Sequence, residues 1–155
     1  MYQVNTSEEM QALGRALADT LHDGDVVLLT GEMGAGKSEL SRGVARGLGI
    51  KGPVPSPTFT ILNLYEEGRM PLYHFDWYRI EDEEELFASG LDEMIGLKGL
   101  TLIEWHEKAP DLRPASGLEI IIQKQDDLSR IVQMKPFGGF HAIDLSKWGN
   151  EVGQC

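Results

Sequence analysis

The chain has 155 residues, of which 41% are hydrophobic and 25% charged, and this composition is typical of one globular domain. We therefore expect a single domain over residues 1–155. Its one cysteine, Cys155, excludes an intramolecular disulfide and a multi-cysteine metal cluster. No apolar stretch approaches the ~20 residues that span a bilayer, and the N-terminal residues lack a secretory-signal pattern. We expect a cytoplasmic protein with no membrane association.

The charge balance is acidic, with 25 Asp and Glu residues against 14 Lys and Arg residues and a formal net charge of −11. A field of this sign repels phosphate backbones and therefore disfavours direct nucleic-acid binding. It also keeps a small domain soluble, so we expect a monomer when the protein is alone. The acidic run at residues 81–85 has a second interpretation, the docking of a basic partner.

The N-terminal half predicts a helix, a strand, a loop and a second helix. Thr6 and Glu9 have the spacing of a capping box, and hydrophobic residues at helical spacing follow, so we expect a helix over residues 7–22. Residues 25–30 form a short apolar run typical of a strand buried on both faces. The next segment, residues 31–36, is glycine-rich. A second helix is expected to end near Gly49.

Prolines interrupt residues 51–58, which must form a loop and are a candidate switch segment. Beyond this loop the pattern predicts two hairpins, one short helix and one buried strand. The expected segments are the hairpin of Phe59–Tyr65 with Met70–Tyr78, the helix at 82–88, the strand at 100–103, and the hairpin of Leu118–Lys124 with Arg130–Phe137. Together they predict a three-layer α/β fold like that of P-loop NTPases, with a central mixed sheet, surrounding helices and a C-terminal β-hairpin.

Residues 31–38 match the pattern G-x-x-x-x-G-K-[ST], in which backbone N–H groups surround a phosphate. Lys37 can reach the β- and γ-phosphates, and Ser38 can bind Mg²⁺. The motif lies between a predicted buried strand and a predicted helix, which is the context that supports a P-loop. The predicted phosphate-binding residues are Gly31, Glu32, Met33, Gly34, Ala35, Gly36, Lys37 and Ser38.

A P-loop NTPase also needs an acidic group at the end of a neighbouring buried strand, and Glu104 has this position. From the residue pattern alone we expect Trp105 to be a core or rim aromatic. Strand alternation places His74, Asp76 and Tyr78 on one face. Asp76 is either a hydrogen-bonded strand end or a group that orients water or helps to bind magnesium, and we expect a structural role for His74.

Four blocks of sequence closely resemble the TsaE (YjeE) family of bacterial ATPases: residues 31–38, residues 55–60 (PSPTFT), residues 74–79 (HFDWYR) and residues 102–105 (LIEW). The resemblance implies an ATPase that uses ATP and Mg²⁺ and is required for threonylcarbamoylation of adenosine 37 in tRNA. It also implies association with the TsaD transferase and its TsaB partner, through which alone the protein would meet tRNA.

The resemblance assigns roles to individual residues. Lys37, Asp76 and Glu104 would be catalytic, Ser38 and Glu104 would serve magnesium, Thr58 would sense the γ-phosphate, and Trp105 would be a functional residue of the nucleotide site. We add Thr6 and Arg130 as hypothetical nucleotide contacts outside the P-loop. The chain departs from the family pattern at Glu39, whose charge could weaken ATP binding, and at His106, where proline is frequent.

Three other functions compete with this interpretation. A small-molecule kinase would need an arginine-bearing lid and an acceptor pocket, and no segment of the chain has either pattern. A regulatory GTPase would need N-K-x-D and D-x-x-G, and neither string occurs. A binding module that changes conformation with nucleotide but does not turn it over remains an alternative.

Overall fold

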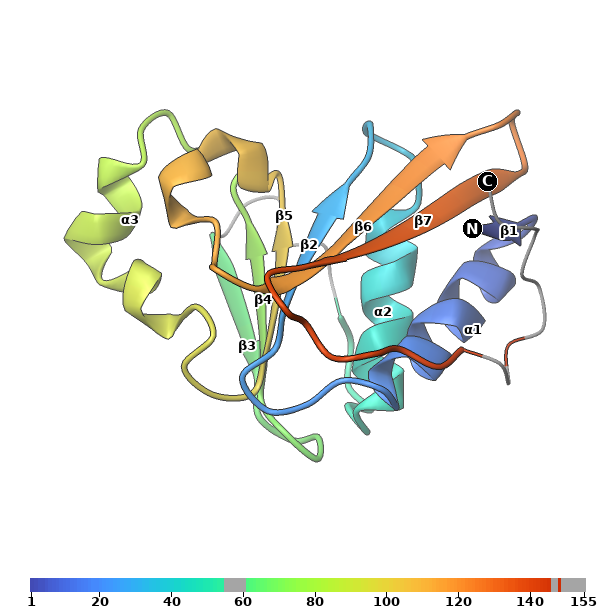
Figure 1. Ribbon diagram of the computed structural model, residues 1–155, viewed down its shortest axis with the longest axis horizontal. Helices are drawn as coiled ribbons and strands as arrows, with labels where there is room; N and C mark the ends of the chain where they lie inside the picture. The colour runs from blue at the N-terminus through green and yellow to red at the C-terminus, as the bar shows by residue number, and fades with distance from the viewer. Residues whose placement is uncertain (55–60, 146–147, 149–155) are drawn as a thin grey trace.

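The computed structural model describes residues 1–54, 61–145 and 148. These residues build one mixed sheet of seven strands in the order β1-β7-β6-β2-β5-β4-β3 (Figure 1). Strands β4, β5, β2 and β6 run parallel to one another, and the pairs β3–β4, β6–β7 and β1–β7 are antiparallel. The strands are β1 Tyr2–Val4, β2 Val26–Thr30, β3 Leu62–Tyr65, β4 Leu72–Asp76, β5 Leu100–Glu104, β6 Gly117–Lys124 and β7 Arg130–Phe137.

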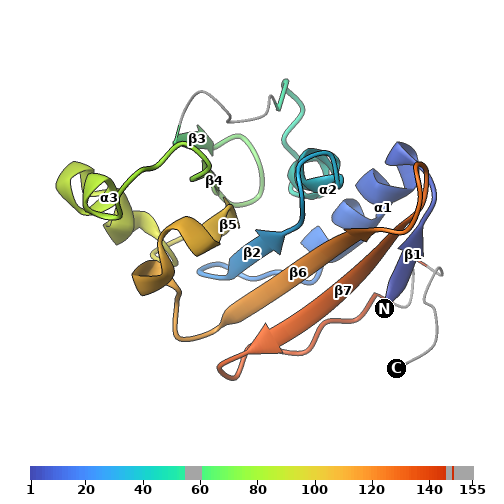
Figure 2. The same cartoon turned by 90° about the horizontal axis from the view of Figure 1, so that it is seen from above.

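Helices cover both faces of the sheet, which confirms the predicted three layers. Helices α1 (Ser7–Ala18) and α2 (Lys37–Gly47) lie together on one face (Figure 2). The other face carries the short helix α3 (Glu84–Ser89) and three 3-10 turns at Leu91–Met94, His106–Lys108 and Pro110–Leu112. No helix among the described residues is long and apolar enough to cross a membrane.

Both faces of strand β2 are buried, which explains its apolar sequence. Val27 and Leu29 belong to the hydrophobic core under α1 and α2, whereas Val26 and Leu28 belong to the core under α3. Because successive side chains of a strand point to opposite faces, a strand covered on both sides loses the usual polar alternation. Two separate cores therefore fix the position of β2, and with it the loop that follows.

The predicted strands and hairpins are confirmed within the described residues, and the first helix differs at its end. Helix α1 stops at Ala18 rather than at residue 22. The hydroxyl of Thr20 donates to the carbonyl of Leu17 at 2.8 Å, a bond that competes with continuation of the helix. The capping box is also modified, because Glu9 accepts from the backbone N–H of Asn5 at 2.8 Å instead of from Thr6.

Strand β1 was not predicted from the sequence. It has three residues and pairs antiparallel with β7, where Tyr2 lies opposite Val132. Beyond β7 the chain turns back along α1, and Leu145 is buried in the core under this helix.

Candidate functional site

The carboxyl ends of β2, β5 and β4 form one edge of the sheet, and the glycine-rich loop leaves β2 at this edge (Figure 1). Asp76 and Glu104 end β4 and β5 and are register partners, so their side chains start side by side. Leu29 of β2 is the register partner of Glu104 on its other side. In open α/β sheets, ligands bind outside the carboxyl ends of the strands.

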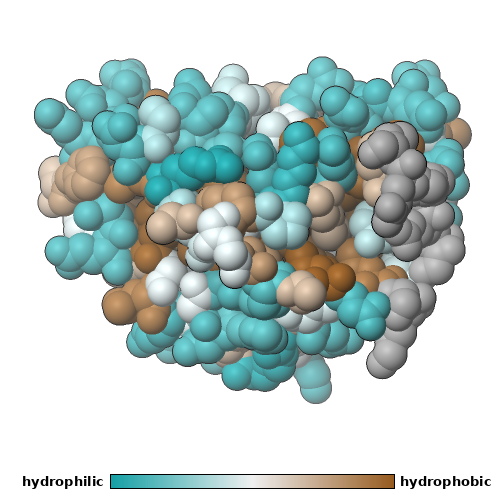
Figure 3. Space-filling view, viewed as in Figure 1, coloured by the Kyte–Doolittle hydropathy of each residue, from teal (hydrophilic) through white to brown (hydrophobic). Residues whose placement is uncertain are grey.

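A cavity of about 350 Å³ opens at this edge. Its lining brings together the predicted phosphate-binding loop and both carboxylates. The lining residues are Met33, Gly34, Gly36, Lys37, Ser38, Glu39, Asp76, Tyr78, Glu104 and Trp105. Hydrophilic side chains dominate this upper edge of the molecule in the space-filling view (Figure 3). The residues that sequence patterns placed in three separate segments therefore share one cavity.

The loop backbone has the shape of an anion cradle. Gly34 and Gly36 adopt left-handed conformations with φ of 80° and 113°, which residues with a side chain rarely adopt. Helix α2 begins directly afterwards at Lys37 and has no side-chain cap among the described residues. The unpaired N–H groups of its first turn and the positive end of its dipole thus face the cavity, as phosphate binding requires.

Lys37 and Trp105 form a cation–π pair inside this cavity. The Lys37 ammonium lies 3.9 Å from the centroid of the Trp105 ring. Burial lowers the pKa of Lys37, and the nearby carboxylates of Glu104, Glu107 and Asp76 oppose that shift. Trp105, which the residue pattern predicted to be a core or rim aromatic, thus lies at the cavity with its ring against the P-loop lysine.

The backbone of Trp105 is strained. It is the one non-glycine residue with positive φ in the described part of the chain, at 59°. Such a conformation costs roughly 1–3 kcal/mol for a bulky residue and persists only where surrounding contacts impose it. Trp105 follows Glu104 at the end of β5, and its ring also packs on that of Tyr78 at 4.9 Å between centroids. The strained turn directs the indole over the cavity.

The two carboxylates are almost completely buried. Glu104 is 3% exposed and accepts from Nε2 of His74 at a distance of 2.6 Å. Asp76 is 8% exposed, and its Oδ1 accepts from the backbone N–H of Tyr78 at 2.9 Å. Burial raises the pKa of Asp76, and the adjacent Glu104 charge adds to this effect. Two buried carboxylates beside one hydroxyl-bearing residue form an oxygen donor set that suits a magnesium ion.

His74 has a closer link to the site than its sequence pattern predicted. It is 1% exposed, and its Nδ1 is buried without a hydrogen-bond partner among the described residues. The ring therefore makes its hydrogen bond through Nε2 to Glu104 alone and fixes the orientation of that carboxylate. Alternation with Asp76 on one strand face was the signal that could have revealed this role.

A second cavity of about 130 Å³ lies on the other side of the P-loop. It brings together Thr6 and Arg130, the two residues that we expected to contact nucleotide outside the loop. The remaining lining residues are Val4, Ser7, Met10, Gly34, Ala35, Gly36, Glu39 and Leu128. The two cavities share three residues, Gly34, Gly36 and Glu39. The two cavities therefore adjoin the same part of the loop.

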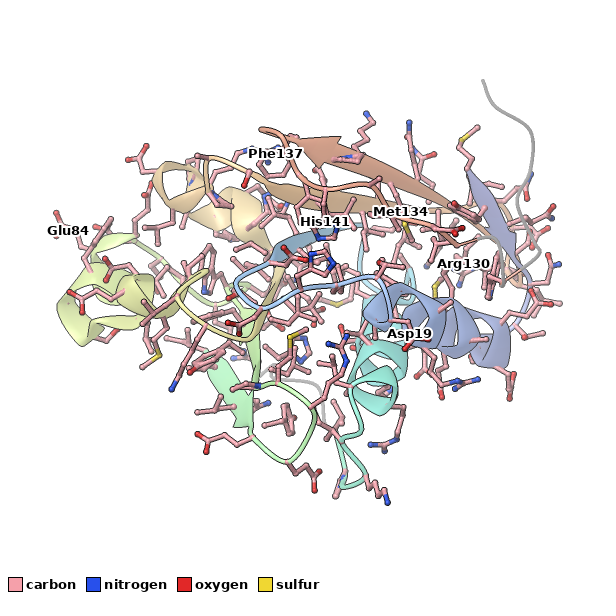
Figure 4. All side chains as sticks on the ribbon, turned by 60° about the horizontal axis from the view of Figure 1, so that its bottom comes forward. Asp19, Glu84, Arg130, Met134, Phe137 and His141 are labelled. Atoms are coloured by element: carbon pink, nitrogen blue, oxygen red, sulfur yellow. The ribbon has the colours of Figure 1, made fainter. Side chains whose placement is uncertain are left out.

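Arg130 also forms hydrogen bonds with the backbone of the P-loop. Its Nε donates to the carbonyl of Ala35 at 3.0 Å, and its Nη2 donates to that of Gly34 at 3.3 Å. Bonds to these carbonyls fix the peptide planes of the loop, and with them the directions of its N–H groups. Figure 4 shows Arg130 beside α1, at the start of β7. Thr6 meanwhile caps α1 by accepting from the N–H of Glu9 at 3.0 Å.

Glu39 and His106, two of the positions that depart from the family pattern, have hydrogen-bond partners. Glu39 forms an ion pair with Arg42 and accepts from Nε2 of Gln11 at 2.6 Å, so its charge is partly compensated. His106 bonds through Nε2 to the hydroxyl of Thr30 at 2.8 Å, directly before the P-loop. Thr58 and the rest of the block at residues 55–60 lie outside the described residues.

Known proteins resemble this chain over most of its length. The family model described as "Threonylcarbamoyl adenosine biosynthesis protein TsaE" matches residues 4–132. The tRNA threonylcarbamoyladenosine biosynthesis protein TsaE of Bacillus subtilis is 41% identical over 146 residues, which cover 92% of this chain and 91% of that protein. The protein of the same name in Nostoc sp. is 40% identical over 131 residues, covering 81% and 78%.

Among solved structures, the crystal structure of Bacillus subtilis YdiB superposes with a TM-score of 0.76 at 34% sequence identity. The match covers 89% of this chain and 84% of the YdiB chain. The α/β fold with its mixed sheet is therefore shared.

Proposed function

The chain belongs to the TsaE family of threonylcarbamoyl adenosine biosynthesis proteins, and we propose that it binds and hydrolyses ATP with Mg²⁺ to support formation of this modified adenosine in tRNA. The observation that carries the proposal is the register of Asp76 with Glu104 beside the P-loop lysine. A phosphate cradle alone supports binding, whereas two carboxylates at the same cavity supply what hydrolysis adds.

In this proposal the P-loop residues bind and neutralise the phosphates. Backbone N–H groups of residues 31–36 and of the first turn of α2 surround the phosphate oxygens. The Lys37 ammonium, which lies over the Trp105 ring, would contact the β- and γ-phosphates when nucleotide is bound. Because Lys37 is 6% exposed, its charge acts in a site from which most water is excluded.

Ser38 and Glu104 would hold magnesium, with Asp76 beside them. When bound, a magnesium ion neutralises charge that develops on the phosphates. Glu104 is held in position by His74, so the residue needs no reorganisation to serve as a ligand. Asp76 would orient the attacking water, because its carboxylate lines the same cavity and has one oxygen bound to the N–H of Tyr78.

The second cavity would accept another part of the nucleotide. Thr6 and Arg130 line it, and the P-loop glycines connect it to the phosphate cavity. Arg130 already donates to two loop carbonyls, so we propose that it acts mainly by holding the loop. Thr58 would sense the γ-phosphate from the proline-rich segment, as its resemblance to a family switch residue implies.

The partners in this proposal are the TsaD transferase and TsaB. The protein would not transfer the group itself, and its hydrolysis of ATP would reset the complex between turnovers. A net charge of −11 supports contact with tRNA through these partners rather than directly.

Phosphate release in the purified chain, alone and with TsaB and TsaD, tests the proposal. We expect steady-state ATP turnover in the complex and repeated rounds of tRNA modification that depend on this chain. Stoichiometric ATP binding without phosphate release would favour the nucleotide-dependent binding module instead. Transfer of phosphate to a small molecule rather than to water would favour a kinase.

A further inference from the structure

A cluster of two histidines and one aspartate lies at the opposite end of β2 from the P-loop. Asp25 immediately precedes this strand, His22 belongs to the turn after α1, and His141 belongs to the segment after β7. One ligand atom from each of the three lies within 4.8 Å of the other two. Figure 4 shows His141 over the turn that joins α1 to β2. Nothing in the proposed ATPase chemistry uses these residues.

The hydrogen bonds of His141 fix its chemistry. Its Nδ1 lies 3.1 Å from the carbonyl oxygen of Ala142, and its Nε2 lies 2.6 Å from Oδ2 of Asp25. A carbonyl only accepts, so Nδ1 carries the hydrogen of that bond. An ionised carboxylate also only accepts, so Nε2 carries a proton in this 2.6 Å bond, and a metal ion bound here would displace that proton. An imidazole whose second nitrogen donates to a backbone carbonyl is oriented as metal-binding histidines are.

The ring of His141 is also held by stacking. Its centroid lies 3.9 Å from that of His22 and 4.2 Å from that of Phe140. We propose that His22, Asp25 and His141 bind one transition-metal ion, with Zn²⁺ as the best match. Two imidazoles and one carboxylate are a common zinc donor set that leaves a fourth position to water, whereas Mg²⁺ prefers oxygen ligands.

Two local movements are needed for this ion to bind. The rings of His22 and His141 are within 20° of parallel, and stacked rings cannot both point a nitrogen at one ion. His22 is exposed and lines a cavity of about 370 Å³ with Asp19 and Asp144, so its ring has room to turn. Nε2 of His141 and Oδ2 of Asp25 lie 2.6 Å apart, whereas two ligands of one tetrahedral zinc ion lie roughly 3.3 Å apart, so these two side chains must also separate slightly.

Metal binding here would join two segments that are distant in the chain. Asp25 and His141 are separated by 116 positions, and an ion between them would close this long loop. Because the unfolded chain lacks the preformed site, metal affinity would add directly to folding stability. The role of the site would be to fasten the segment after β7 against the turn between α1 and β2.

Titration of the metal-free chain with Zn²⁺ by calorimetry tests the site without any nucleotide. A Cys155→Ser background removes the one thiolate that could bind zinc elsewhere. We expect one ion per chain and a higher Tm with zinc. His22→Ala, His141→Ala and Asp25→Asn should each lower the affinity at least about tenfold, the lower end for lost support of a metal site. Glu66→Gln, which removes an exposed carboxylate elsewhere, is the control that should bind as the parent does.

Two further measurements keep the result independent of folding and of the nucleotide site. In the chain with all four histidines intact, zinc should shift the ring-nitrogen resonances of His22 and His141, and unchanged resonances would refute the site. Glu104→Gln should leave zinc affinity unchanged, and a loss there would place the ion at the nucleotide cavity instead. Parental zinc affinity in both histidine variants would also overturn the proposal. None of these measurements depends on ATP turnover.

Discussion

At the carboxyl end of β2 the site is built largely from contiguous residues, because the P-loop follows the strand and leads directly into α2. At the amino end of β2, Asp25 meets His141, which is 116 positions away. The two ends also differ in electrostatics. Helix α2 begins at the first end and favours anions, whereas α1 ends near the second and favours cations through the negative end of its dipole.

Contacts at the amino end agree with this polarity. The guanidinium of Arg69 donates to the carbonyls of Ala18 and Leu21, the last residues around the end of α1. At the carboxyl end, the ammonium of Lys37 lies over the Trp105 ring, and its charge is balanced by Glu104, Glu107 and Asp76. One central strand thus separates a site suited to phosphate from a site suited to a cation.

The largest expected effect is at the carboxyl end. We expect Lys37→Ala to reduce ATP turnover at least about a hundredfold, because the charge on the phosphates is then left uncompensated in the transition state. The fold should survive, since the aliphatic core does not depend on this side chain. Phosphate release and thermal unfolding measure the two quantities. Lys98→Ala, at an exposed position, is the matched control. Parental turnover of Lys37→Ala in the complete complex would contradict the P-loop assignment.

Asp76→Asn and Glu104→Gln should separate binding from hydrolysis. Each change keeps the shape of the side chain and removes the charge that would hold magnesium or orient water. We expect ATP affinity to change less than the rate of turnover. Calorimetry and phosphate release check this, with Glu93→Gln as an exposed control. A variant with both parental affinity and parental rate would assign a structural role to that carboxylate.

The carboxyl end of β2 could be predicted from the sequence because its signals are local. An apolar run predicted β2, a contiguous motif predicted the loop, Glu104 followed a predicted strand, and Asp76 lay near the carboxyl end of the predicted strand Met70–Tyr78. Parallel strand ends meet at one edge, so local signals were enough to place these residues together. The hydrogen bond from Arg130 to the carbonyl of Ala35 could not be predicted, since it joins positions 95 apart through a single side chain.

The other elements that sequence reasoning missed depend on contacts between distant segments. Strand β1 is three residues long and is a strand because β7 is beside it. The early end of α1 depends on Thr20 and on Arg69, a residue 51 positions away from Ala18. The hydrogen bond between His74 and Glu104 needs two strands in register. Hydrophobic periodicity reports none of these pairings.

Gly14→Ala tests the packing that holds both ends of β2 under α1 and α2. A Cβ at Gly14 would lie 2.5 Å from the carbonyl oxygen of Leu40 and 2.8 Å from the nitrogen of Val44. Since both are backbone atoms, the helices must separate, and we expect a loss of about 1–3 kcal/mol in the free energy of unfolding. Denaturant unfolding measures it, with Arg15→Ala on the exposed face of α1 as control. Unchanged stability would show that the helices can shift freely.

Arg130→Gln should weaken nucleotide binding by about tenfold, the scale of one lost charge-assisted hydrogen bond. The carbonyls of Ala35 and Gly34 lose their donor, so the loop N–H groups lose part of their preorganisation. Turnover at saturating ATP should fall less, because Asp76 and Glu104, the proposed catalytic carboxylates, are untouched. Arg15→Gln controls for loss of one positive charge. Affinity equal to that of the parent would remove Arg130 from the site.

The smallest expected effect separates two roles of Thr6. As the cap of α1, Thr6 accepts from the N–H of Glu9, and Thr6→Ala should cost about 1 kcal/mol of stability. Aspartate caps equally well, so Thr6→Asp should restore stability. Because Thr6 also lines the cavity beside Gly34 and Gly36, the new carboxylate should repel a bound phosphate and weaken ATP affinity several-fold at low salt. If Thr6→Asp binds ATP as the parent does, Thr6 serves the helix alone, and the nucleotide does not approach α1.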